Sequence, residues 1–204
     1  MFALFLENPI IGILAMLGLV AAITIHEFAH AWVADKLGDP TPRLQDRVSL
    51  DPRKHLDPMG TLLILFLGFG WGKPVEFDPF NLKHLRRDAA LIALAGPASN
   101  LLTAGILALA MRLLPLLGFV DLAAALTIQL SVMLAVFNMI PIHPLDGGKI
   151  ILAFLPEETA HEWDEMMHRY GIWILLFLIL PLGGQSAASR LIQPIISTIV
   201  SFMI

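Results

Sequence analysis

Cysteine is missing from this 204-residue sequence. Its absence excludes disulfide bonds, thiol nucleophiles and cysteine-ligated zinc sites, so a metal could be bound only through His, Asp or Glu. Charge is also scarce: charged residues make up 15% of the chain, both signs share the same loops, and the formal net charge is -4. A surface of one sign is not expected, which excludes nucleic acid as a partner.

Apolar residues dominate the composition instead, at 57%. A soluble domain of this length could not bury so much apolar surface, so the sequence predicts an integral membrane protein in contact with the lipid bilayer. The N-terminus lacks the basic region of a signal peptide, and its apolar stretch continues directly into polar residues. We therefore interpret that stretch as a mature transmembrane helix.

Three segments are long and apolar enough to span a bilayer, which takes about 20 mostly apolar residues. They cover about 9–36, 88–114 and 121–140. The link at 115–120 is so short that the second and third helices must run antiparallel. The predicted fold is therefore an all-α, multi-pass membrane protein built on a three-helix core.

Two segments between the first and second helices are too short to span. Residues 59–71 are apolar, which predicts a re-entrant or interfacial segment, and residues 72–79 are punctuated by proline and predict an extended, β-like stretch. No internal repeat is found, so we expect a single membrane domain over 1–204, with a core at about 9–150 and a helical region at about 151–204.

The C-terminal region predicts one or two membrane-associated helices. Residues 149–155 suggest a short helix, and 156–169 a polar, solvated stretch. An apolar run follows at 170–182, and 185–204 predicts an amphipathic helix interrupted by Pro194.

Basic residues indicate the orientation in the membrane. Nine of the thirteen Lys and Arg residues lie between Lys36 and Arg87. The positive-inside rule predicts that this loop is cytoplasmic, so the first helix begins outside and the third ends on the cytoplasmic side. We expect a protein of the cell membrane whose functional site faces the cytoplasm.

Residues 26–30 have the sequence His-Glu-Phe-Ala-His, an HExxH pattern in the last third of the first predicted helix. In a helix, His26 and His30 lie about 40° apart around the axis and about 6 Å apart along it, so both can bind one ion. Glu27 then lies beside a water on that ion. Ordinary contacts between helices are the alternative, but ionisable residues inside a membrane cost about 2.5 kcal/mol or more and are usually functional.

A catalytic zinc site needs a third protein ligand and an open position for water. Spacing alone allows Asp46, Asp51, Asp57, Glu76 or Asp146. Position favours Asp146, because it lies just past the cytoplasmic end of the third helix, at the same side as the HExxH motif. Prolines and glycines around it would hold a fixed turn, although Asp146 could equally be the N-cap of the next helix.

Three further polar residues are candidates for the site. Asn138, near the end of the third helix, could donate to an oxyanion or simply bond another helix. Asn100 could contact substrate or pack helices together. His143 is expected to lie behind the ligands or at the surface, because a fourth ligand would close the position that water needs.

These residues carry a resemblance to the site-2 protease family. The HExxH motif at 26–30, and Asn138 followed by residues 141–147, resemble the family's two signature motifs. Residues 95–100 resemble its middle core helix, 70–75 is also similar, and the resemblance spans about 10–149. It implies Asp146 as the third ligand of one zinc ion per chain, in a minimal form without PDZ or CBS domains.

The resemblance implies an intramembrane zinc metalloprotease, acting on membrane proteins in or near their transmembrane helices. Zinc would polarise the scissile carbonyl and lower the pKa of a bound water, whose proton Glu27 would transfer to the leaving amine. The substrate helix must unwind, and residues 73–77 are expected to hold it by strand addition. A divalent-metal transporter or a metal-sensing membrane protein, using the same His and Asp residues, is the alternative.

Overall fold

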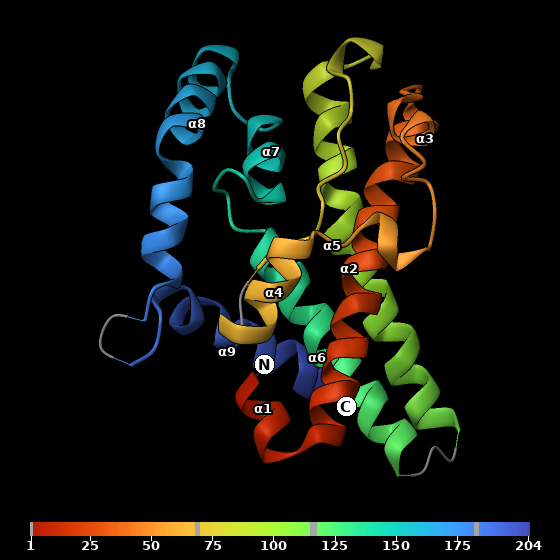
Figure 1. The fold of residues 1–204 in the computed structure, drawn as a ribbon. Coiled ribbons are helices and arrows are strands. Elements are labelled where there is room, and N and C mark those ends of the chain that lie inside the picture. The colour runs from red at the N-terminus through yellow and green to blue at the C-terminus, as the bar shows by residue number, and fades with distance from the viewer. Residues whose placement is uncertain (1, 68–69, 115–117, 182–183) are drawn as a thin grey trace.

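The computed structural model describes residues 2–67, 70–114, 118–181 and 184–204, and it is built of helices joined by loops (Figure 1). Within these ranges, three helices are long and apolar enough to cross a membrane: α2 (Pro9–Leu37), α5 (Leu85–Leu113) and α6 (Phe119–Asn138). They confirm the three predicted spans. Helix α5 begins three residues before the predicted start.

Helix α2 carries its start and stop signals in the sequence. The side chain of Asn8 accepts hydrogen bonds from the backbone N–H groups of Ile10 and Ile11, at 3.1 and 3.2 Å, and Pro9 occupies the first helical position. The helix ends at Gly38, whose φ of 109° is the left-handed conformation that glycine adopts without strain. These caps fix where the helix that carries the HExxH motif lies along its axis.

Helices α2, α5 and α6 pack against one another and form the core. Small residues allow close approach in membrane helices. At the contact between α2 and α6, a Cβ added to Gly18 would lie 2.7 Å from Oγ1 of Thr127. Ala22, Ala104 and Ala135, one from each helix, are also buried. Side-chain volume therefore limits how closely the three helices can pack.

A long excursion joins α2 to α5. It contains α3 (Thr41–Leu44), η1 (Pro52–Lys54), α4 (Pro58–Leu67) and η2 (Pro79–Asn81). The predicted β-like segment is extended from Gly70 to Asp78, but no strand occurs in the described residues, only an isolated antiparallel bridge between Leu56 and Gly72. Pro74 explains part of this, because it cannot donate to a strand ladder. The re-entrant placement of 59–71 stays a prediction.

The buried carboxylate of Asp39 ties this excursion together. It accepts hydrogen bonds from the backbone N–H and hydroxyl of Thr41, the N–H of Asp78 and the side chain of Asn81. These bonds lower the pKa of Asp39 although burial opposes its ionisation. Both ends of the excursion are thereby fixed at the end of α2.

Three helices follow the core: α7 (Asp146–Leu152), α8 (Glu157–Ile179) and α9 (Ala187–Met203). The predicted short helix at 149–155 starts three residues earlier than expected. The predicted polar stretch at 156–169 and the apolar run that begins at 170 lie largely on one continuous helix, α8, which ends at Ile179; residue 182 lies outside the described ranges. Histidine and carboxylate side chains lie one turn apart in its polar half, as His161 and Glu165 do at 3.3 Å.

Pro194 lies inside α9 without ending it. The helix continues because a single missing N–H removes one backbone bond, and membrane helices tolerate this. Helix α8 packs against α7 and α9 (Figure 1). Neither a PDZ nor a CBS domain occurs within the described ranges.

Candidate metal centre

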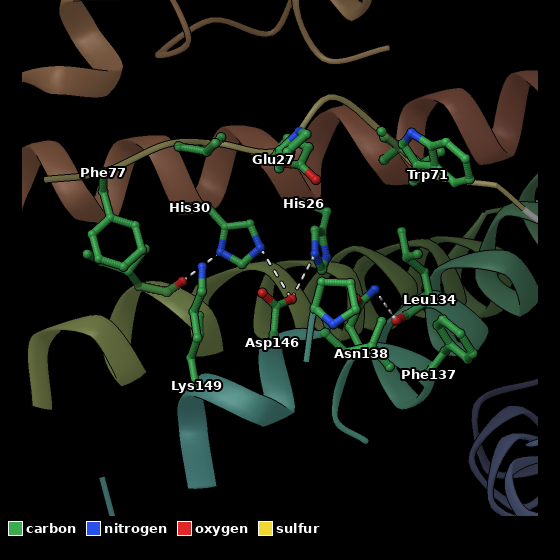
Figure 2. A pocket seen from close by; sticks show the side chains of 18 of the residues that line it. His26, Glu27, His30, Trp71, Phe77, Leu134, Phe137, Asn138, Asp146 and Lys149 are labelled. Carbon is green, nitrogen blue, oxygen red and sulfur yellow. Dashed lines mark hydrogen bonds and ion pairs between the residues drawn. The ribbon is translucent and has the colours of Figure 1, made fainter. Parts of the chain in front are cut away.

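The structure brings His26, His30 and Asp146 together. Nε2 of His26 lies 3.1 Å, and Nε2 of His30 3.3 Å, from the same carboxylate oxygen, Oδ2 of Asp146. One possible ligand atom from each residue lies within 4.8 Å of the others. Figure 2 shows the three side chains converging from α2 and from the start of α7. The geometry is that of a group able to hold one ion.

The other acidic candidates are occupied elsewhere. Asp46 pairs with Lys54, and Asp51 with Arg53 at 2.8 Å. Asp57 accepts from the backbone of Gly60 at the start of α4, and Glu76 accepts from Gln45. Of the five acidic residues that spacing allowed, only Asp146 reaches the histidines in the described part of the chain.

A tight turn after α6 aims Asp146 at the histidines. Asp146 is the first residue of α7, and no side chain caps that helix, so the cap alternative is not what the structure shows. Gly147 and Gly148 press against the preceding backbone; a Cβ on Gly148 would lie 3.1 Å from N of His143. Because neither glycine has a side chain, the chain can fold back on itself next to the metal group.

A hydrogen bond at Nδ1 determines the tautomer of each histidine. Nδ1 of His26 lies 2.7 Å from Oδ1 of Asn100, and Nδ1 of His30 lies 2.7 Å from the backbone oxygen of Ile92. The amide nitrogen of Asn100 donates to the backbone oxygen of Ala22 at 3.0 Å, which leaves Oδ1 as the acceptor. Both imidazoles therefore carry hydrogen on Nδ1, and each directs Nε2, the ring nitrogen that can bind a metal, toward Asp146.

This arrangement fits a cation. Oδ2 of Asp146 is buried and has no hydrogen-bond partner among the described residues, and Nε2 of each histidine faces it, at 3.1 and 3.3 Å. Such a set is satisfied when a positive ion lies between its members. Two imidazoles and one carboxylate form the donor set of a catalytic zinc ion, which keeps a further position open.

Gly96 of α5 makes room for this group. A Cβ on Gly96 would lie 2.6 Å from Cε1 of both His26 and His30, closer than side-chain atoms can approach. The histidine rings therefore lie directly against the backbone of α5. Any other residue here would displace them.

Glu27 lies on the other side of the histidines, beside two residues to which sequence patterns gave no role. Nη2 of the buried Arg47 is 4.0 Å from Oε2 of Glu27. His55 is fully buried, and its Nε2 lies 2.6 Å from the backbone oxygen of Ser49. Burial lowers the pKa of both Arg47 and His55. No local signal marks them, because they lie 20 or more residues from Glu27.

The metal group opens into a cavity of about 310 Å³ with a largely apolar lining. Trp71 and Phe77 lie toward opposite ends of it (Figure 2), and Lys149 reaches over the ring of Phe77, with Nζ 4.9 Å from the ring centroid. Asn138 lines the cavity, and its Nδ2 donates to the backbone oxygen of Leu134 at 3.0 Å. A chain threaded here would meet mainly apolar walls.

Two predicted candidates lie outside this cavity. Asn100 is fully buried and both ends of its amide are bonded, so the predicted substrate contact is not what the structure shows; it packs α5 against α2 and orients His26. His143 stacks on His168, with ring centroids 4.3 Å apart, and does not belong to the metal group.

Apolar spanning helices that hold an HExxH metal group define a membrane-embedded metalloenzyme. Residues 115–182 match the model of Peptidase family M50. Two relatives carry the name "Putative zinc metalloprotease". YwhC of Bacillus subtilis (strain 168) is 40% identical over 176 residues, or 81% of this chain and 80% of the relative. Rip2 of Mycobacterium tuberculosis (strain ATCC 25618 / H37Rv) is 29% identical over 177 residues, or 83% and 68%.

No solved structure matches this chain. The chain belongs to peptidase family M50, the site-2 proteases, and is a zinc metalloprotease of the membrane. The resemblance that the motifs suggested is thereby confirmed. The alternative of a metal transporter or sensor is set aside, because both relatives are named as metalloproteases.

Proposed function

We propose that this protein cleaves membrane-protein substrates within or next to their transmembrane helices. The observation that carries the proposal is the position of the metal group, which lies between α2, α5 and the turn after α6. Helices α2, α5 and α6 are all apolar and of spanning length. A peptide that enters the apolar cavity beside it must lie at the depth of the membrane. Transmembrane segments are the peptides available there.

In the proposed reaction, His26, His30 and Asp146 hold zinc, which supplies Lewis-acid activation of the scissile carbonyl and of the attacking water. The carboxylate of Glu27 accepts the proton of that water and delivers it to the nitrogen of the leaving amine. No covalent bond forms between the protein and the substrate. Asn138 lines the cavity and gives one N–H of its amide to the backbone oxygen of Leu134; its second N–H would donate to the oxyanion that forms on the carbonyl.

The stretch predicted at 73–77, taken together with Gly72 before it, holds the unwound substrate by strand addition. The N–H of Lys73 donates to the backbone oxygen of His55 at 2.7 Å, and its carbonyl accepts from Arg47, so Lys73 faces the loop. Backbone groups alternate in direction along an extended chain, so the groups of Gly72 and Glu76 face the other edge. A proline substitution at Glu76, which removes an N–H donor from that edge, should reduce cleavage; unchanged cleavage would contradict strand addition.

The site faces the cytoplasm of the cell membrane in this proposal, because the basic loop from Lys36 to Arg87 adjoins it. The absence of cysteine makes orientation simple to test. A single cysteine introduced at the exposed Arg53 should react with an impermeant maleimide only after the cytoplasmic face is opened. If the maleimide labels this cysteine in intact cells, the loop lies outside the cell and the proposed orientation is wrong.

The central experiment is cleavage by the purified protein in liposomes that contain a membrane-spanning test substrate. Glu27→Gln should retain zinc, and its cleavage rate should be about 10²- to 10⁴-fold lower than that of the wild type, since general-base catalysis contributes that factor. Zinc content, measured beside the rate, separates loss of the base from loss of the metal. Cleavage that survives Glu27→Gln would refute the mechanism.

A further inference from the structure

Arg47 differs from the other basic residues of its loop. Arg53, Lys54 and Arg43 lie at or near the surface and pair with nearby acidic residues; the side chain of Arg53 is 88% exposed. Arg47 is only 3% exposed, although it occupies the same loop. Its guanidinium points inward, with Nη2 4.0 Å from Oε2 of Glu27.

The backbone of the loop turns Arg47 inward. Asp46, just before it, has a φ of 59°, and the N–H of Arg47 donates to the backbone oxygen of Pro42 at 2.8 Å. Burial lowers the pKa of Arg47, and the charges of Glu27 and Glu76 oppose that shift. An arginine pKa lies so far above neutrality that the group keeps its charge. A permanent positive charge therefore lies beside the carboxylate of Glu27.

The same guanidinium also holds the extended segment. Nη2 of Arg47, which is 4.0 Å from Oε2 of Glu27, donates to the backbone oxygen of Lys73. The preceding residue, Gly72, adjoins Glu27: a Cβ added there would lie 3.6 Å from Oε1 of Glu27. One side chain thus contacts both the predicted base and the stretch at 72–77.

Loop stability alone does not account for a buried guanidinium. Taking a charge out of water is costly, and an apolar side chain of similar volume is often at least as stable. Nε of Arg47 has no hydrogen-bond partner in the part of the chain that the structure describes. The favourable contacts of the side chain are those with Glu27 and Lys73.

We propose that Arg47 is a positioning residue for peptide hydrolysis: its guanidinium fixes the carboxylate of Glu27 relative to the carbonyl of Lys73. The base is then aligned with whichever peptide lies along 72–77. This proposal rests on the proposed function, since it takes Glu27 as the base and 72–77 as the segment that holds substrate. It predicts a loss in kcat rather than in zinc binding or KM.

The test compares three variants in the liposome assay, with zinc content, kcat and KM measured for each. Arg47→Gln removes the charge and should lower kcat about 100-fold, the usual cost of displacing a catalytic group by about 1 Å. Arg47→Lys keeps the charge but cannot reach both partners at once, and should lose about 10-fold. The matched control, Arg53→Gln, changes an exposed arginine of the same loop and should leave kcat unchanged. Zinc should stay at one ion per chain, and KM within about threefold.

A second comparison asks whether Arg47 acts through Glu27. In a Glu27→Asp background the carboxylate is already withdrawn, so Arg47→Gln should cost much less than it does in the wild-type protein. Equal losses in both backgrounds would overturn the proposal.

Other outcomes also decide it. A kcat for Arg47→Gln within about threefold of wild type overturns the proposal, and so does a fall in kcat that merely follows a loss of zinc. If Arg47→Gln does not fold, the test is the kcat of Arg47→Lys, and a kcat equal to that of the wild type overturns the proposal. A wild-type protein that cleaves only soluble peptides refutes the membrane substrate, and the Arg47 variants are then measured on those peptides; a wild-type protein that cleaves neither refutes both proposals.

Discussion

Asn100 is expected to control zinc affinity without touching the metal. Replacing it with Leu, a side chain of similar size, removes the acceptor that holds the Nδ1 hydrogen of His26 and the donor to the backbone oxygen of Ala22. The imidazole of His26 then loses the contact that fixes its tautomer and orientation. The ligand set itself, His26, His30 and Asp146, remains complete.

Two independent estimates give the size of the effect. Loss of a group that orients a metal-binding histidine typically costs about 10- to 100-fold in metal affinity or activity, or about 1.4 to 2.8 kcal/mol. A buried hydrogen-bond donor left without its acceptor costs about 1 to 3 kcal/mol. The two ranges overlap. The unpaired-donor estimate applies here because Asn100 is fully buried, so water cannot replace the lost acceptor.

Competition for zinc against a chelator of known affinity, with purified protein, measures this change. Asn100→Asp keeps an acceptor and should bind zinc more tightly than Asn100→Leu. Ser99→Ala is the matched control. The hydroxyl of Ser99, the residue before Asn100, donates to the backbone oxygen of Gly96 and not to a histidine. A zinc affinity of Asn100→Leu equal to that of wild type would refute the role assigned to the Asn100 amide.

Two further predictions concern the packing and the protonation of the site. Gly96→Ala should abolish zinc binding while the helices still form, since its Cβ would lie 2.6 Å from both imidazoles; zinc at one ion per chain would contradict this packing. Burial lowers the pKa of His55, so its contribution to stability is full above its ordinary value near 6.5 and is lost as pH falls through the lowered value. Melting temperatures from about pH 7.5 to pH 5 should fall less steeply for His55→Asn than for wild type, and equal slopes would contradict it.

Local patterns were sufficient for much of the fold. Length and hydropathy belong to single segments, so the sequence alone predicted the three spans within a few residues. Asn8, Pro9 and Gly38 mark the ends of α2 by chemistry that acts within one turn. Composition did not reveal that the polar and apolar stretches share α8, because solvent and apolar surroundings can change along one continuous helix.

The site divides in the same way. His26, Glu27 and His30 could be recognised from sequence because residues one turn apart share a helix face wherever the helix lies. Asp146 could not be selected over four other acids by spacing, since its distance to the histidines depends on how α2, α6 and the turn before α7 pack. The motif and its chemistry were determined by the sequence itself.

Only the tertiary structure decided which groups surround that motif. Asn100 and the backbone of Ile92 orient the two imidazoles, and Arg47 lies against Glu27, yet each comes from a separate segment of the chain. The physical reason is that helix periodicity acts over a few residues, whereas these contacts depend on the packing of three helices and one buried loop. Sequence predicts the residues that bind zinc on one helix; packing determines the residues that hold them in place.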